Sequence, residues 1–375
     1  MKTKLHTLAE VGQSVWLDHI DRPLITSGGL ANYVARGLRG VTSNPAIFQK
    51  AISDSRHYDT QIQELASEGK SEQEIYEALT VEDSRMAADV LRPVFDESDG
   101  TDGFFSLEVN PHLAHDRQGT VNEATRLFTL VDRPNVMIKV PATQEGVQAF
   151  QQLIEDGINI NVTLMFSLEQ YDQIAEAYLS ALEKRAANIY NLRQIASVAS
   201  IFVSRLDTNL DKMLDAFKTP KADALKGTIA IANAKMAYQH FKEYFLSERW
   251  KHLEEKGARI QKVLYGSTGT KNPDYSDVVY VENLIGPNTI NTIPPKTLEM
   301  FLDHGTVALT LESGLDEARA QLHQLAELGI DLDEVTRQLL DEGVENFVKP
   351  YDELIKTITE KKMELSAPEL IRHKI

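Results

Sequence analysis

A lysine stands in the middle of a short apolar segment. Lys139 lies within the run from Val136 to Pro141, whose length and composition predict a strand buried on both faces. Lysine is almost never fully buried unless it is paired or functional. Burial disfavours the ammonium form and favours the neutral amine, which is the nucleophile of Schiff-base chemistry. The alternative is a lysine that ends its strand and extends to water, so the rest of the sequence must decide.

Eight short apolar segments of this kind alternate with amphipathic stretches that resemble helices. The expected strands are Ser14–Asp18, Gly40–Asn44, Phe104–Val109, Val136–Val140, Ile158–Leu164, Ala196–Val203, Val263–Ser267 and Thr289–Ile293. This alternation predicts a single α/β domain over residues 1–375, a parallel (β/α)8 TIM barrel. The rival architecture, an open doubly wound sheet, usually has a glycine-rich phosphate loop after its first strand, and none is present.

Three regions do not fit a simple strand–helix repeat. Residues 45–103 and 206–262 are too long for one helix each, and both are predicted to be helical insertions within the barrel. The tail after Phe301 is predicted to form several helices, including Asp333–Gly343 and Val344–Lys362.

Seven of the expected strands end in polar residues. Because TIM barrels place their reactive groups at the carboxyl ends of the strands, these side chains should converge. They are Asp18, Asn44, Glu108, Lys139, Asn161 with Thr163, Ser200 and Ser267. Two acids, a lysine, amides and hydroxyls predict covalent amine catalysis on a polyhydroxylated substrate.

Each of these residues also has an ordinary explanation when taken alone. Asp18 and Glu108 are compatible with a loop acid and a solvated strand end, and Asn44 before Pro45 is a common turn dipeptide. Arg205, directly after the sixth strand, has Asp207 or Asp211 close by as an ion-pair partner. The joint pattern around Lys139 argues against these separate explanations.

Composition excludes several classes of protein. The chain has no cysteine, which excludes disulfides, thiolate catalysis and zinc–thiolate sites. Its formal net charge of -17 argues against nucleic acid or an anionic membrane as a partner. No apolar run approaches a membrane span and no signal peptide is visible, so we expect a cytoplasmic protein. A monomer and a homodimer both remain open.

Two motifs suggest ligands that we do not expect. His112 and His115 stand three residues apart next to Asp116, but Pro111 and the loop-like context favour a solvated turn over a metal site. The segment Gly266–Lys271 resembles a nucleotide P-loop, but only two residues separate its glycines and the lysine does not follow the second one. Neither a metal nor a cofactor is expected.

Six separated segments resemble the transaldolase family. Gly40–Phe48 resembles its first signature, and Ile138–Gly146 with Ala149 resembles its second, the Schiff-base lysine region. Four further segments resemble the remaining site segments in the same order: Trp16–Asp18, Ser106–Val109, Asn161–Leu164 and Ser200–Arg205. The resemblance covers roughly residues 12–305, and the long insertions resemble the longer bacterial form of the family.

The resemblance implies a reaction in which a dihydroxyacetone unit passes from a ketose phosphate to an aldose phosphate, in the pentose phosphate pathway. The donor would be sedoheptulose 7-phosphate or fructose 6-phosphate, and the acceptor glyceraldehyde 3-phosphate or erythrose 4-phosphate. Lys139 would form the imine, and Asp18 would remove the hydroxyl proton that triggers carbon–carbon cleavage. The resemblance further implies that Glu108 and Thr163 hold a water molecule, Asn44 and Asn161 bind hydroxyls, and Ser200 and Arg205 hold the phosphate.

Two positions depart from the family pattern. The segment after the seventh strand matches the phosphate-binding arginine region only loosely, with Lys271 at the cationic position and Ser267 before it. Related aldolases that release free dihydroxyacetone from fructose 6-phosphate are shorter and tend to have tyrosine where this chain has Phe202. Both points favour the transferase. Such an aldolase is the first alternative, and a non-catalytic barrel that binds sugar phosphates is the second.

Overall fold

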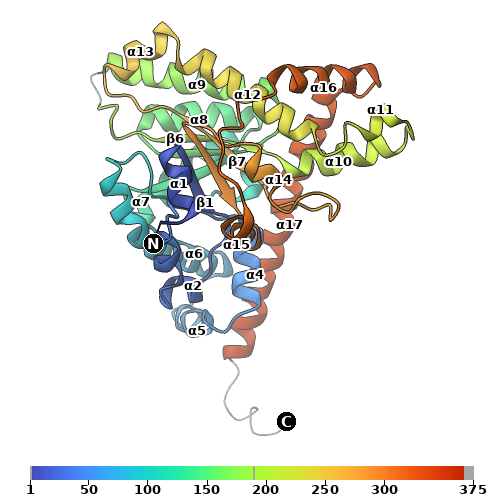
Figure 1. Ribbon diagram of the computed structural model, residues 1–375. Helices are drawn as coiled ribbons and strands as arrows, with labels where there is room; N and C mark the ends of the chain where they lie inside the picture. Colours follow the sequence, from blue (N-terminus) through green and yellow to red (C-terminus); the bar gives the residue numbers. More distant parts are fainter. Residues whose placement is uncertain (1, 189–190, 367–375) are drawn as a thin grey trace.

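A computed structural model of the chain describes residues 2–188 and 191–366. The remaining residues of the predicted domain 1–375, namely 1, 189–190 and 367–375, lie outside the described residues. Eight parallel strands close into a barrel in chain order, which confirms the predicted TIM-barrel fold (Figure 1). The strands are β1 Gln13–Leu17, β2 Gly40–Thr42, β3 Phe104–Glu108, β4 Val136–Pro141, β5 Ile160–Met165, β6 Ser197–Phe202, β7 Lys262–Gly266 and β8 Thr289–Ile293.

Side chains that point into the barrel change from apolar to polar along the strands. A separate apolar cluster is formed by Trp16, Phe104, Met137, Val198, Leu264 and Ile290, together with Ala196. Because side chains alternate with a period of two, the next inward positions are Asp18, Ser106, Lys139, Ser200, Gly266 and Thr292. The same alternation therefore fills the amino-terminal half of the barrel and brings polar groups together at its carboxyl-terminal end.

The Trp16 side chain helps to fill the amino-terminal half of the barrel. A Cβ atom at Gly40 would lie 2.5 Å from the atoms of the Trp16 ring, so glycine at this position lets the indole pack against β2. The indole Nε1 donates a hydrogen bond to Asp102 Oδ1 at 3.0 Å, and Arg39 Nε donates to Asp102 Oδ2 at 2.8 Å. The buried carboxylate is thus paired, as burial of a charge requires.

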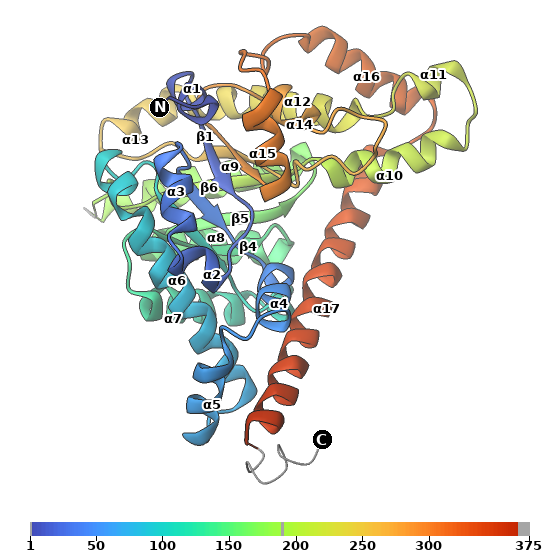
Figure 2. The ribbon, with the colours of Figure 1, turned by 60° about the horizontal axis from the view of Figure 1, so that its bottom comes forward.

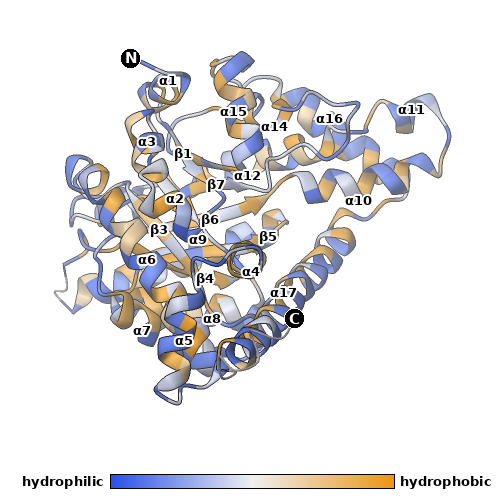
Figure 3. Cartoon of the chain, turned by 90° about the horizontal axis from the view of Figure 1, so that it is seen from below, coloured by the Kyte–Doolittle hydropathy of each residue, from blue (hydrophilic) through white to orange (hydrophobic). Residues whose placement is uncertain are grey.

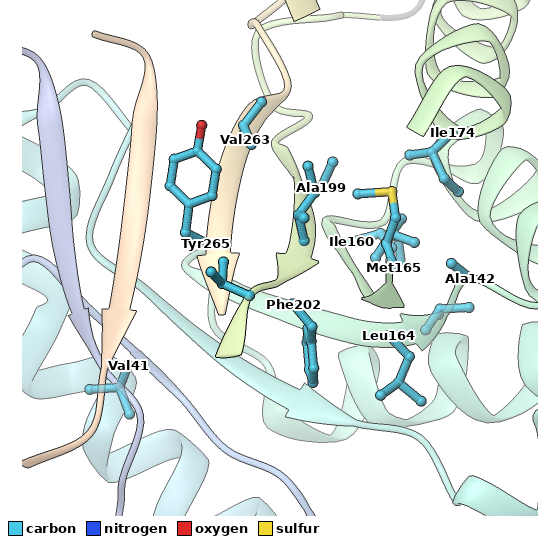
Figure 4. Packing of buried hydrophobic residues seen from close by; sticks show 14 of the residues in the cluster. Val41, Ala142, Ile160, Leu164, Met165, Ile174, Ala199, Phe202, Val263 and Tyr265 are labelled. Atoms are coloured by element: carbon cyan, nitrogen blue, oxygen red, sulfur yellow. The ribbon is translucent and has the colours of Figure 1, made fainter. Parts of the chain in front are cut away.

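Helices cover the outside of the barrel. They are α1 Lys4–Glu10, α2 Arg22–Thr26, α3 Gly29–Ala35, α4 Pro45–Ser53, α5 Asp59–Ser67, α6 Glu72–Glu97, the 3-10 helix η1 Pro111–Leu113, α7 Arg117–Val131, α8 Gln144–Asp156, α9 Leu168–Ala187, α10 Ser204–Asp215, α11 Pro220–Asp223, α12 Ile229–Phe245, α13 Glu248–Glu254, α14 Val279–Glu282, α15 Pro295–His304, α16 Leu315–Glu327 and α17 Leu332–Ser366. Outward-facing strand residues pack against them. Figure 4 shows part of this layer, including Ile160 and Met165 of β5 and Ile174 of α9.

The described end of the chain is helical, as expected, but the predicted division into two helices near residue 343 was wrong. Asp333–Gly343 and Val344–Lys362 are not two helices but parts of the single helix α17. Gly343, at the expected boundary, lies inside the helix, and a Cβ atom there would lie 3.0 Å from Leu164 Cδ2, so glycine permits close packing against the barrel. Helix α17 runs along α4, α5 and α6 (Figure 2).

The far end of α17 is anchored by ion pairs. Lys361 Nζ lies 2.6 Å from Asp59 Oδ1, and Lys362 Nζ lies 3.1 Å from Glu72 Oε1. Hydrophobic and hydrophilic residues are interspersed along α17, as expected for a helix with one packed face (Figure 3). In the described part of the chain, no helix combines the length and the apolar composition that crossing a bilayer requires.

Candidate active site

Lys139 is held inside the barrel by two acceptors. It is 4 % exposed, and in register it lies between Glu108 of β3 and Asn161 of β5. Its Nζ donates to Glu108 Oε2 at 3.1 Å and to the carbonyl oxygen of Ser43 at 2.9 Å. The alternative of a lysine that extends to water is therefore wrong.

The Lys139–Glu108 pair can share a proton. Burial raises the pKa of the Glu108 carboxyl, and the Lys139 charge only partly opposes this effect. A carboxyl group with a raised pKa, in contact with an ammonium, is able to accept its proton. Glu108 can thus hold a proton beside the Lys139 nitrogen, where imine formation requires an acid.

Asp18 directly follows β1. Its Oδ1 accepts a hydrogen bond from Thr42 Oγ1 at 2.9 Å, and the Thr42 hydroxyl lies 2.6 Å from Thr292 Oγ1. Burial raises the pKa of the Asp18 carboxyl, and the positive charge of Lys139 opposes the rise. Asp18 is thus tuned toward accepting and returning a proton rather than toward a permanent ion pair.

Asn161 and Ser200 belong to one hydrogen-bonded chain. Ser200 Oγ donates to Asn161 Oδ1 at 2.6 Å, and Asn161 Nδ2 donates to Ser106 Oγ at 3.1 Å. These bonds orient the amide across β3, β5 and β6. A buried amide oriented in this way presents its edge to the barrel mouth with little freedom to turn.

An irregularity in β5 sets the orientation of Thr163. The register between β5 and β6 shifts between Val162 and Met165, and Leu164 has a φ of 57°, which is uncommon for a residue other than glycine. The buried Thr163 Oγ1 has no hydrogen-bond partner in the described part of the chain. An unsatisfied buried hydroxyl beside a cavity indicates a place for a water molecule or a ligand.

Asn44 has a structural role as well as a position in the site. It is the N-cap of α4, and its Oδ1 accepts from the backbone N–H of Ile47 at 3.0 Å. This hydrogen bond fixes the orientation of the Asn44 side-chain amide and leaves its Nδ2 available to a ligand.

Two cations follow β6 and β7. Arg205 lies in the first turn of α10, and its buried Nη1 has no partner among the described residues. The two alternative partners named above accept other hydrogen bonds: Asp207 accepts from Ala230 N at 2.8 Å and Tyr280 Oη at 2.9 Å. Asp211 accepts from Gly227 N at 3.0 Å and Tyr275 Oη at 2.7 Å. Lys271 lies at the cavity mouth, where the surrounding protein and the Arg205 charge lower its pKa to about 8.

Ser267 joins these cations through its neighbour. It follows β7 with a φ of 55°, and its Oγ lies 3.0 Å from Ser204 Oγ, one residue before Arg205. The two loops after β6 and β7 are therefore connected at the point where the cations emerge.

One cavity of about 420 Å³ brings these side chains together. It is lined by Asp18, Asn44, Lys139, Asn161, Thr163, Ser200, Arg205, Ser267 and Lys271 among the predicted residues. Of the predicted residues, only Glu108 is absent from the lining, since it lies behind Lys139. Four cations and a single carboxylate face this cavity, in a chain whose net charge is -17. Such an excess of positive charge favours an anionic ligand.

Several lining residues were missed by sequence reasoning. Thr42 and Thr292 occupy inward strand positions, so the alternation along β2 and β8 would have found them. Lys296 follows β8 by three residues and adds a fourth cation. Phe347 comes from α17, and nothing in the local sequence indicates that it reaches the barrel.

The histidines near η1 do not face one another. His112 Nε2 lies 2.7 Å from Asp352 Oδ1, and His115 Nδ1 lies 3.4 Å from Glu145 Oε2. Among the described residues, no group of three or more histidine or acidic side chains is arranged to hold a metal ion.

Comparison with known proteins agrees with this geometry. The family model described as Transaldolase/Fructose-6-phosphate aldolase matches residues 15–358. A protein of Trichodesmium erythraeum named Transaldolase is 45% identical over 370 residues, covering 96% of this chain and 97% of its own. A Transaldolase of Thiobacillus denitrificans is 48% identical over 352 residues, covering 94% and 98%, respectively. A Transaldolase of Thermobifida fusca is 46% identical over 362 residues, covering 96% and 98%.

Proposed function

The chain belongs to the transaldolase/fructose-6-phosphate aldolase family, as its sequence predicted, and on that premise we propose how its residues perform the transaldolase reaction. A dihydroxyacetone unit is taken from a ketose phosphate, held on Lys139 and passed to an aldose phosphate. The observation that supports this most directly is the buried Lys139 amine, 3.1 Å from Glu108 and open to a cavity that Asp18 also lines.

Imine formation uses Lys139, Glu108 and Thr163. The neutral Lys139 amine attacks the ketose carbonyl, because Glu108 can take its proton. The carbinolamine then loses its hydroxyl group as water when an acid protonates it. Glu108 supplies that proton. The unpaired Thr163 hydroxyl holds the water molecule that connects Glu108 to the carbinolamine hydroxyl.

Carbon–carbon cleavage uses Asp18. Asp18 removes the proton from the substrate C4 hydroxyl, the C3–C4 bond breaks, and the electron pair moves into the imine to give an enamine on Lys139. The same acid returns the proton when the enamine attacks the second aldehyde. Its raised pKa suits this reversible transfer.

The substrate is positioned by the remaining residues. Asn44 and Asn161 bind hydroxyl groups, with Ser200 orienting Asn161 and contributing its own hydroxyl. Arg205, Lys271 and Lys296 hold the phosphate, with Ser267 beside them. Arginine does this with a planar fork and lysine as a point charge, so both are suited to a dianion.

Transfer is favoured over release of dihydroxyacetone. Phe202, which packs edge-on against Phe166 at 5.5 Å, faces the cavity with an apolar ring and brings no hydroxyl group that could protonate the enamine. With no phenol at this position to protonate its carbon, the enamine persists until an aldehyde arrives. We place the reaction in the cytoplasm.

Borohydride trapping tests the proposal. The protein is reduced in the presence of fructose 6-phosphate, and the modified peptide is mapped. The adduct is expected on Lys139 and absent in Lys139→Arg, whose guanidinium cannot form the neutral nucleophile. Lys235→Arg is the matched control, since Lys235 is also buried but donates to Ser313 O away from the cavity.

Product formation with and without an acceptor aldose, together with the trapped adduct, distinguishes the alternatives. A transaldolase gives product only when an acceptor aldose is added, whereas an aldolase releases free dihydroxyacetone without one. A barrel that only binds sugar phosphates gives no adduct, and an adduct on another lysine would contradict the role of Lys139.

A further inference from the structure

Glu108 faces a second cavity that the reaction described above does not use. This rear cavity has a volume of about 190 Å³ and lies between α6, α7 and α17 at the end of β3. Its inner wall includes Glu108, Thr80, Asn110, Tyr76, Glu123 and Tyr351. Lys139 and Thr163 line the sugar cavity and not this one, so the Lys139–Glu108 contact lies at the boundary between the two spaces.

The rear cavity is polar and large enough for water. A water molecule occupies about 30 Å³ of liquid, so the space has room for several. Asn110 N donates to Glu123 Oε1 at 3.1 Å, and Asn110 Nδ2 donates to Tyr351 Oη at 3.3 Å. The Tyr76 and Tyr351 rings, which both line the cavity, meet edge-on at 5.1 Å, so each ring limits the rotation of the other. A row of fixed donors and acceptors is the environment in which water molecules order.

The outer end of the rear cavity reaches solvent. Gln73 is exposed, and Glu77 forms an ion pair with Arg126, half of whose side chain is exposed (49%). Glu108, at the inner end, is only 7 % exposed. The cavity therefore connects a buried carboxyl group to the surface without passing through the sugar cavity.

We propose that the rear cavity is a water channel through which Glu108 exchanges protons and water with solvent while a sugar fills the front cavity. Tyr76 and Glu123 are its positioning residues. This inference rests on the proposed role of Glu108 in imine formation and deepens it.

The need for such a channel follows from the chemistry. When the carbinolamine C–O bond breaks, the nitrogen lone pair forms the C=N bond, and the leaving oxygen takes the Glu108 proton and departs as water. Hydrolysis of the imine reverses each step, with water adding to carbon and returning one proton to Glu108. A sugar phosphate occupies the front cavity during both steps, so the rear is the side from which water can leave and return.

The groups along the channel are able to hold protons. Burial raises the pKa of the Glu123 carboxyl. Burial, followed by the charges of Tyr351 and nearby acids, raises the pKa of the Tyr76 phenol, which therefore stays protonated and available as a donor. Glu108, Glu123 and Tyr76 thus line one and the same cavity.

Oxygen exchange tests the channel. In water enriched in ¹⁸O, each cycle of imine formation and hydrolysis replaces the carbonyl oxygen of fructose 6-phosphate, so the exchange rate measures the passage of water. We expect exchange to fall about tenfold in Tyr76→Phe and in Glu123→Gln, because a positioned proton donor typically contributes at least that much. Gln keeps the oxygen that accepts from Asn110 N but holds no exchangeable acid proton. The solvent isotope effect on exchange should rise in both variants.

Controls separate the possible failures. Tyr244→Phe removes a phenol from α12, outside both cavities, and should leave exchange unchanged. If wild-type protein shows neither exchange nor a trapped adduct, the proposed function fails. If it shows both, and the two variants exchange as fast as wild type with the same isotope effect, the channel is wrong and water passes through the front cavity.

Discussion

The ring of Phe347 lies 5.7 Å from Lys139 Nζ, although one residue belongs to the terminal helix and the other to the middle of the barrel. The same ring lies 5.8 Å from Arg205 Cζ. An aromatic face near a cation contributes about 0.5–2 kcal/mol. One apolar residue therefore contacts both the group proposed to form the imine and a group proposed to hold the phosphate.

Replacing Phe347 should weaken catalysis more than stability. In Phe347→Leu the site keeps an apolar wall but loses the aromatic face, so kcat/KM for fructose 6-phosphate should fall roughly tenfold. Steady-state transfer kinetics measure this, and Phe128→Leu on α7 is the control for a partly buried phenylalanine away from the site. Unchanged kinetics would show that α17 only covers the barrel.

Arg205 should recognise phosphate without taking part in the chemistry. A charge-assisted hydrogen bond contributes roughly 1.5–3 kcal/mol, so Arg205→Ala should lower kcat/KM on fructose 6-phosphate by about one to two powers of ten. The loss on unphosphorylated fructose should be much smaller, because no dianion is left without its partner. Lys139 should still be trapped at high substrate concentration. Equal losses on both sugars would instead assign Arg205 to the fold or to the chemistry.

Lys271 should make phosphate binding depend on pH. Its pKa is lowered to about 8, so the free enzyme loses this charge as the pH rises through that value. The KM for fructose 6-phosphate should therefore increase above about pH 8 in wild type. In Lys271→Arg the guanidinium stays charged, and the increase should disappear. A KM that rises equally in both proteins, or that rises for unphosphorylated fructose as well, would point to a different group.

Asp207 should make stability depend on pH. Burial raises its pKa to about 7, whereas the unfolded chain has a value of about 3.9. Between these two values the folded protein holds a proton that the unfolded protein releases. The contribution to the free energy of unfolding is fully present below about pH 3.9 and is lost as the pH rises through about 7.

Asp207→Asn should remove this dependence. The loss of unfolding free energy between pH 5 and pH 8 should be smaller by roughly 1–3 kcal/mol than in wild type. Denaturant unfolding at the two pH values measures the difference, with the exposed Asp156→Asn as control. The same loss in wild type and variant would mean that Asp207 is already ionised at pH 5.

Periodicity was sufficient to place the main groups of the site. Lys139, Glu108 and Asp18 lie at inward positions of strands that the apolar runs predicted, and a closed parallel barrel brings such positions together. Thr292 follows the same rule, so the sequence could have predicted it. The position of Phe347 could not be predicted, because it depends on the docking of a helix distant in sequence. The boundary expected at Gly343 was wrong because this glycine packs on Leu164 inside a continuous helix, and such a tertiary contact outweighs the usual preference of glycine for helix ends.

The continuity of α17 makes it a spacer of set length. Phe347 reaches the sugar cavity at one point along it, and Lys361 reaches Asp59 near its other end. Deleting or inserting one residue between them would turn one end relative to the other by about 100°. Either the aromatic wall or the outer ion pair would then be lost. Surface loops elsewhere tolerate changes in length at small cost, so related chains should vary in those loops while keeping the number of residues in this stretch.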